Sequence, residues 1–123
     1  EYSGCYEKYA STTGLVKRAL AVDPGLTSGR AVFAAFDRPE VHRVIDEWID
    51  EIVTGLVTLI HIFNPSRIVL GGGIMVQPYV LEQVQERLIP RLSPGFRKVN
   101  IARASLGNQA GLLGAAHLAE EML

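Results

Sequence analysis

Three adjacent glycines, Gly71-Gly72-Gly73, are the residues of this sequence best suited to holding a ligand. They follow the short apolar run Ile68-Val69-Leu70, which is typical of a central parallel strand. Because glycine has no Cβ atom, another group can approach the peptide N–H and C=O groups of such a loop closely. At the carboxyl end of a strand in an α/β sheet, that group is usually a ligand. The loop therefore predicts a small-molecule site, with a tight strand-to-helix turn as the alternative.

The same loop lacks the features of two common phosphate-binding motifs. No Gly-Lys-Ser/Thr sequence follows it, so it is not a Walker A loop. Val76 stands where a dinucleotide fingerprint would have its third glycine, and no acidic residue stands about 20 positions further on. The sharper expectation is a nucleotide held against bare backbone.

A second segment rich in small residues runs from Gly107 to Ala116. Gly111 and Gly114 each cost a helix about 1 kcal/mol relative to alanine. With Ala110 and Ala115 they form a helix face that carries almost no side chain. We expect this face to pack closely against the sheet, with the approach of a flat ligand as the alternative.

The segment Gly4-Cys5-Tyr6-Glu7 holds the only cysteine and a carboxylate at the expected start of a helix. A structural zinc ion needs four ligands, so one thiolate cannot form such a site alone. A glutamate in the first turn of a helix is most often a favourable partner of the helix dipole. Taken alone, these residue types predict structural roles for both Cys5 and Glu7.

Other polar side chains fall within a long helical pattern from Pro39 to Phe63. His42 and the acidic run from Asp46 to Glu51 lie on its charged face, which we expect to be solvated. His61 lies in the apolar half and is predicted to be a buried histidine with its hydrogen bonds satisfied. Because charges stop after Thr54, that half is predicted to be buried on most sides.

The remaining elements follow from periodicity and from helix-ending residues. Helices are predicted at about 7–22, from the N-cap Ser28 to Phe36, at 77–89 ended by Pro90, and from the cap Asn108 to about 123; strands are predicted at 68–70 and 98–104. Alternation of strand and helix in the second half indicates an α/β layer. Two strands do not form a stable sheet alone, so we expect missing chain or a partner to complete it.

Length and composition limit the classes of protein to which this chain can belong. A length of 123 residues allows one domain at most, and a net charge of −1 gives no reason to expect nucleic acid or an anionic membrane as partner. No apolar run reaches the roughly 18 residues that span a bilayer. A single cysteine excludes an internal disulfide and fits a reducing cytoplasm. The chain opens at Glu1 without methionine, so we expect a piece of a longer protein.

Together these motifs resemble the ROK family of repressors, uncharacterised reading frames and sugar kinases. The resemblance rests on Gly4-Cys5-Tyr6-Glu7 running into Tyr9-Ala10-Ser11, on Asn64-Pro65 after a long helix, on Leu70 with the three glycines, and on Gly107 to Ala116. Each motif is weak alone. Their order and spacing over nearly the whole chain make the match specific.

The resemblance implies the incomplete carboxyl-terminal lobe of an actin/hexokinase/Hsp70 (ribonuclease-H-like) fold, with residues 1–123 as a single partial domain of a glucokinase- or fructokinase-like protein. It implies ATP with Mg²⁺ in a cleft between lobes, with Gly71, Gly72 and Gly73 against the adenosine and α-phosphate. Glu7 matches the carboxylate that holds sugar hydroxyls, a task that suits an acceptor-only group. Cys5 matches the last cysteine of a zinc motif, whose preceding cysteine would fall immediately before Glu1. The chain is expected to begin inside that motif.

The family function implied is ATP-dependent phosphorylation of a hexose or amino sugar. The family's Asp-x-Gly-Gly phosphate loop, catalytic Asp and sugar-binding histidine have no counterpart in this sequence, so no catalytic residue is assigned. Phosphoryl transfer needs positioning, charge stabilisation and a base, and the isolated chain is therefore predicted to be inactive.

Two alternatives remain open. One is the body of a sugar-responsive ROK repressor, and the other is a non-catalytic module for nucleotide binding or dimerisation. The resemblance also implies a cytoplasmic homodimer that binds sugar and ATP, with no contact to nucleic acid from this segment.

Overall fold

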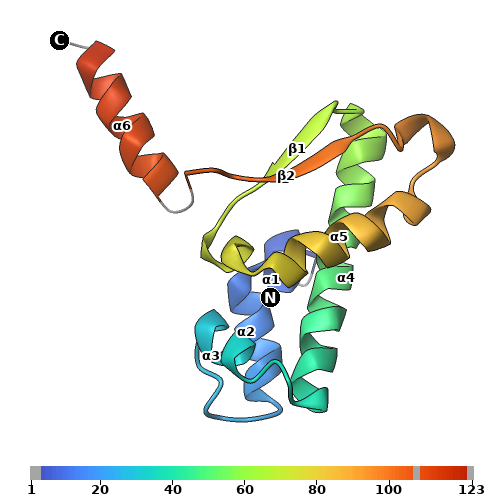
Figure 1. Ribbon diagram of the computed structural model, residues 1–123, viewed down its shortest axis with the longest axis vertical. Helices are drawn as coiled ribbons and strands as arrows, with labels where there is room; N and C mark the ends of the chain where they lie inside the picture. The colour runs from blue at the N-terminus through green and yellow to red at the C-terminus, as the bar shows by residue number, and fades with distance from the viewer. Residues whose placement is uncertain (1–3, 107–108, 122–123) are drawn as a thin grey trace.

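The long helix α4 (Pro39–Phe63) is the element on which much of the chain packs. The computed structural model describes residues 4–106 and 109–121. Helices α1, α2 and α5 contact α4, and the two strands pair with each other (Figure 1). The other elements are α1 (Tyr6–Ala10), α2 (Thr12–Leu20), α3 (Gly29–Ala34), β1 (Arg67–Leu70), the 3-10 helix η1 (Gly73–Val76), α5 (Pro78–Arg91), the 3-10 helix η2 (Pro94–Phe96), β2 (Asn100–Arg103) and α6 (Ala110–Glu121).

Helix α4 has the bounds that the sequence predicts. Pro39 fits its first turn, and Asn64 ends it in the left-handed conformation at φ 43°. Its apolar stripe forms the centre of the core, where Ile45, Ile49 and Ile60 are fully buried. The prediction that the second half is buried on most sides is wrong, because Phe63 is 71% exposed and Ile62 66%. Among the described residues, no element covers that side.

The helix predicted at 7–22 is two helices, α1 and α2, with a break at Ser11. Extended backbone at Ser11 (ψ 163°) turns the chain, and the Ser11 side chain accepts a hydrogen bond from the Gly14 amide at 3.1 Å. The indole Nε1 of Trp48 donates to the carbonyl oxygens of Ala10 at 3.1 Å and Ser11 at 3.0 Å. The Trp48 indole of α4 thus supplies a donor to the Ala10 carbonyl at the break, while the Ser11 carbonyl also accepts the first hydrogen bond of α2 from the Leu15 amide at 3.1 Å.

The two strands form a parallel pair joined through α5, in which Ile68 lies opposite Ile101 and Leu70 opposite Arg103. This confirms the α/β arrangement of the second half. The prediction that β1 is a central strand buried on both faces is not met, since its burial alternates and Val69 is 57% exposed. In the described part of the chain the sheet has two strands, fewer than a stable sheet needs.

Helix α5 runs to Arg91, slightly past the end predicted at Ile89, because Pro90 is accommodated in its last turn. Helix α6 extends away from the other elements (Figure 1) and has no buried residue. A Cβ atom at Gly111 or Gly114 would meet no atom within 4 Å, so the prediction that this face packs against the sheet is wrong. The predicted cap Asn108 lies outside the described residues.

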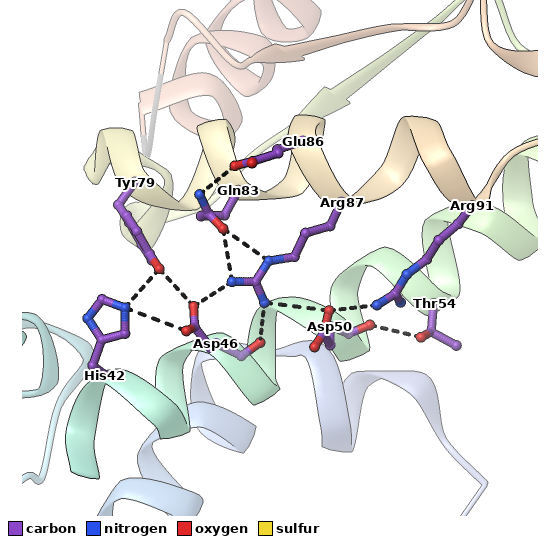
Figure 2. A network of polar contacts seen from close by, with 9 residues as sticks. All are labelled: His42, Asp46, Asp50, Thr54, Tyr79, Gln83, Glu86, Arg87 and Arg91. Atoms are coloured by element: carbon purple, nitrogen blue, oxygen red, sulfur yellow. Dashed lines mark hydrogen bonds and ion pairs between the residues drawn. The ribbon is translucent and has the colours of Figure 1, made fainter. Parts of the chain in front are cut away.

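The acidic face of α4 is solvated only in part: Glu47 is exposed, but α5 packs against Asp46 and Asp50. Arg87 on α5 donates to Asp46 at 2.6 Å, and Arg91 donates to Asp50 at 2.8 Å (Figure 2). His42 also faces α5, with Nε2 at 3.0 Å from the Tyr79 hydroxyl. The prediction that His42 is solvated is met only in part, since its side chain is 37% exposed. The acidic side chains of α4 are paired with arginines of α5. Periodicity within each helix does not predict that these two helices lie side by side.

His61 is half-buried, with Nδ1 at 2.8 Å from the Val57 carbonyl oxygen and Nε2 at 3.3 Å from the Ser93 hydroxyl. Its hydrogen bonds are satisfied as predicted, although its burial is incomplete. Within the described ranges, none of the helices combines the length and apolar character that crossing a membrane requires.

Candidate functional site

The loop Gly71–Gly73, here called the glycine loop, lies where three cavities meet. It follows β1 and leads into η1, and the Gly72 carbonyl accepts a hydrogen bond from the Met75 amide at 3.1 Å. Gly72 has φ 103°, a conformation that side chains other than glycine rarely adopt. Gly72 lines all three cavities, whose volumes are about 470, 290 and 150 Å³. The residues predicted to bind a ligand therefore border open space.

The largest cavity, about 470 Å³, lies between α3 and the segment that precedes α5, and we call it the α3 cavity. Arg30 and Phe33 from α3 line one side, and Gln77 and the glycine loop line the other. Among the described residues, Arg30 has no ion-pair partner. An aromatic ring, an amide and a free guanidinium around one hollow suit a flat heterocycle that carries negative charge.

The cavity of about 290 Å³ lies between the α1–α2 break and the glycine loop, and we call it the junction cavity. Tyr6, Ser11 and Trp48 line it from the helical side. The smallest cavity, about 150 Å³, is bounded by Arg103 and Ser105 after β2 and is called the β2 cavity. Arg103 also lacks an ion-pair partner within the described ranges.

The surroundings of Gly71 and Gly72 differ from those of a glycine that close packing requires. Gly72 is required by its positive φ, as a tight turn would require. A Cβ atom at Gly71 would meet no atom within 4 Å, so contacts among the described residues do not explain that glycine. By contrast, a Cβ at Gly29 would lie 3.0 Å from Thr12 Cγ2, so close packing explains Gly29. Gly71 leaves bare backbone facing two of the cavities, where another group could approach it.

Glu7 and Cys5 lie at the start of α1, outside the linings of the three cavities. Both are exposed, and Cys5 is the N-cap residue of α1 with a free thiol. Tyr6, between them, is the residue of this segment that lines the junction cavity. Groups of three or more His, Cys, Asp or Glu side chains able to hold a metal do not occur among residues 4–106 and 109–121.

Four residues of the site were not identified from the sequence: Arg30, Phe33, Gln77 and Arg103. Arg30 and Phe33 stand three apart on α3 and so share a face, but that spacing alone predicts only an ordinary short helix. Their relation to the glycine loop arises from packing between segments distant in sequence. Phe33 and Gln77 face a common cavity only in the folded chain.

A cluster of side chains lies behind the α3 cavity: Phe36, His42, Asp46 and Tyr79, here called the Tyr79 cluster. The Tyr79 hydroxyl donates to Asp46 Oδ1 at 2.8 Å and lies 3.0 Å from His42 Nε2 (Figure 2). Phe36 packs edge-on against the Tyr79 ring, with centroids 4.8 Å apart. Burial and the bond to the Asp46 carboxylate raise the pKa of Tyr79 to about 12, so the phenol is protonated at neutral pH and donates.

A family model described as the ROK family matches residues 1–122. A β-glucoside kinase from Listeria innocua is 35% identical over 112 residues, which cover 89% of this chain and 35% of that protein. An N-acetyl-D-glucosamine kinase from Escherichia coli is 28% identical over 117 residues, which cover 94% of this chain and 39% of that protein.

Two solved structures are similar in fold. The ROK hexokinase from Thermus thermophilus matches with a TM-score of 0.76 and 28% identity, over 98% of this chain and 42% of that one. A ROK family glucokinase from Streptomyces griseus, in complex with glucose and AMPPNP, matches with a TM-score of 0.78 and 28% identity, over 94% of this chain and 44% of that one. The chain thus spans less than half the length of each relative.

Proposed function

The chain belongs to the ROK family, and from that membership we propose that it forms the nucleotide-binding wall of an ATP-dependent sugar kinase. The relatives named above include kinases of β-glucosides and N-acetyl-D-glucosamine, which supports a hexose or amino sugar as the substrate class. The proposed domain is one incomplete carboxyl-terminal lobe over residues 1–123. Because the chain spans less than half of those relatives, the activity proposed belongs to the whole kinase.

The observation that carries the nucleotide assignment is the meeting of three cavities at Gly72. The adenine ring would lie in the α3 cavity against Phe33, with the Gln77 amide as a hydrogen-bonding partner. The bare backbone of the glycine loop would border the adenosine and α-phosphate. Arg30 and Arg103, on either side of the loop, would supply positive charge to the phosphates.

Magnesium would reach this site with the nucleotide. Mg²⁺ usually keeps several waters and is held by phosphate oxygens with one or two carboxylates. In the part of the chain that the structure describes, the linings of the three cavities contain no Asp or Glu, so the protein ligands of Mg²⁺ would come from elsewhere in the whole protein. When bound, the ion would neutralise charge on the phosphates during transfer.

Glu7 is the proposed sugar-binding residue of this segment. Its exposed carboxylate stands in the first turn of α1, next to Tyr6 at the junction cavity. A carboxylate can accept hydrogen bonds from two adjacent hydroxyls, which matches a sugar.

Cys5 would contribute one thiolate of four zinc ligands in the whole protein, and the other three would come from other residues. A cytoplasmic homodimer is proposed as well, supported by the exposed apolar end of α4 at Leu59, Ile62 and Phe63.

The chemistry that the described linings of the three cavities offer is binding without proton transfer. Among residues 4–106 and 109–121, no Asp, Glu or His lines the three cavities, so no described base faces a sugar hydroxyl there. Phosphoryl transfer would require the family's phosphate loop and catalytic aspartate. This same observation favours the second candidate function, a non-catalytic nucleotide-binding module.

Calorimetric titration with ADP, comparing the unaltered protein with Gly71→Val, tests the proposal. A side chain at Gly71 enters open space, so we expect the variant to fold normally and to lose binding at least about tenfold, which is about 1.4 kcal/mol. Gly95→Val is the matched control, because a Cβ there also meets nothing within 4 Å but lies away from the three cavities. Equal affinity of all three proteins would contradict the assignment of the glycine loop.

A further inference from the structure

The two walls of the α3 cavity are connected through the Tyr79 cluster. Phe33, on one wall, stacks on Phe36 with ring centroids 6.3 Å apart and an interplanar angle of 11°. Phe36 in turn contacts the rings of His42 at 4.5 Å and Tyr79 at 4.8 Å. Gln77, on the other wall, stands two residues before Tyr79. A displacement of Tyr79 would therefore change the positions of both Phe33 and Gln77.

Asp46 on α4 connects this cluster to two residues of α5. Its Oδ1 accepts hydrogen bonds from the Tyr79 hydroxyl at 2.8 Å and from Arg87 Nη2 at 2.6 Å (Figure 2). The Asp46 carbonyl oxygen also accepts from Arg87 Nη1 at 3.0 Å. Arg87 holds the middle of α5, and the Tyr79 hydroxyl ties the first turn of α5 to the same carboxylate.

The first turn of α5 has few other polar constraints. Its N-cap residue, Gln77, makes no side-chain capping hydrogen bond, and Pro78 has no N–H to donate. Val80 packs in the core and is fully buried, so the turn stays attached without the hydroxyl. What the hydroxyl adds is orientation of the turn that carries Gln77.

We propose that Tyr79 is a positioning residue: bonded to Asp46 and His42, it sets the separation of Phe33 and Gln77 across the α3 cavity and thereby the affinity for nucleotide. The affinity part rests on the proposed function. The positioning part rests on ring contacts and hydrogen bonds present in the ligand-free chain.

The test compares Tyr79→Phe with Arg91→Gln. The first variant keeps the ring against Phe36 and removes only the hydroxyl, while the second removes the Arg91–Asp50 bond of 2.8 Å between the same two helices. Ligand-free protein is examined by NMR at the Phe33 ring and the Gln77 amide, and ADP affinity is measured by calorimetry. We expect Tyr79→Phe to shift both sets of resonances and to weaken ADP binding about fivefold, the equivalent of one hydrogen bond.

Arg91→Gln should leave the Phe33 and Gln77 resonances and the ADP affinity unchanged, although we expect it to lower the stability of the fold about as much as Tyr79→Phe does. Asp46→Asn, which keeps an acceptor of the same shape, should shift the resonances in the same direction by less. Unchanged resonances in Tyr79→Phe, or equal shifts in Arg91→Gln, would overturn the positioning role. If the unaltered protein does not bind ADP, the proposed function fails, and the resonances still decide whether Tyr79 positions the walls.

Discussion

Gly55 offers a sharp test of how α1 is seated on α4. Alanine in place of a glycine inside a helix ordinarily stabilises it by about 1 kcal/mol. Here the Tyr6 ring occupies the space: a Cβ at Gly55 would lie 2.7 Å from the Tyr6 hydroxyl oxygen and closer still to Cε2 and Cζ. Tyr6 would have to leave, together with its hydrogen bond to the Ile52 carbonyl at 2.9 Å.

The expected loss outweighs the gain in helix propensity. The hydrogen bond contributes about 1 kcal/mol. Tyr6 is 44% exposed, so displacing it returns to water roughly 100 Å² of aromatic surface, which is about 2.5 kcal/mol at 25 cal/mol per Å². After the propensity gain, Gly55→Ala should lower the free energy of unfolding by about 2.5 kcal/mol and Tm by about 10 °C.

Urea denaturation followed by tryptophan fluorescence is the assay, since Trp48 is the only tryptophan and is 1% exposed. Tyr6→Ala provides the matched background. In that background the clash is gone, so Gly55→Ala should stabilise by about 1 kcal/mol, reversing its sign. A Gly55→Ala variant that is more stable than the unaltered protein would refute the seating of Tyr6 against α4.

Two further predictions concern titration and activity. The pKa of Tyr79 is raised to about 12 in the folded chain, so its contribution to stability is fully present below the ordinary tyrosine pKa near 10 and is lost as pH rises through 12. Urea midpoints between about pH 10 and 12 should therefore fall less steeply in Tyr79→Phe, and equal slopes would count against the bond to Asp46. The chain incubated with Mg²⁺, ATP and glucose or N-acetyl-D-glucosamine should release no ADP above background in a coupled assay. Measurable turnover by pure protein would show that the chain carries a catalytic base of its own.

Local signals predicted the bounds of α4 and the place of the glycine loop directly after a strand. The helix is encoded by an apolar repeat with a proline at its start and an asparagine at its end, all of which act within a few residues. The glycine loop is encoded by composition alone. Neither depends on knowing which segments pack together.

Features that depend on distant contacts were missed. The break at Ser11 is contacted by the Trp48 indole from another helix, and the acidic face of α4 is partly covered because Arg87 and Arg91 lie on α5. Arg30 and Phe33 join the candidate site through packing with the glycine loop. For α6, the predicted packing surface has no counterpart among the described residues.

The parallel pair of β1 and β2 has a consequence for handling this chain. In a sheet of two strands each strand is an edge, so a row of main-chain donors and acceptors on its outer side has no strand to pair with in the described structure. Val69, 57% exposed, adds apolar surface beside one such row. Edge strands of this kind recruit further strands from other molecules. Concentrated samples of the chain should therefore self-associate by strand addition, and a lysine at Val69 should slow that process.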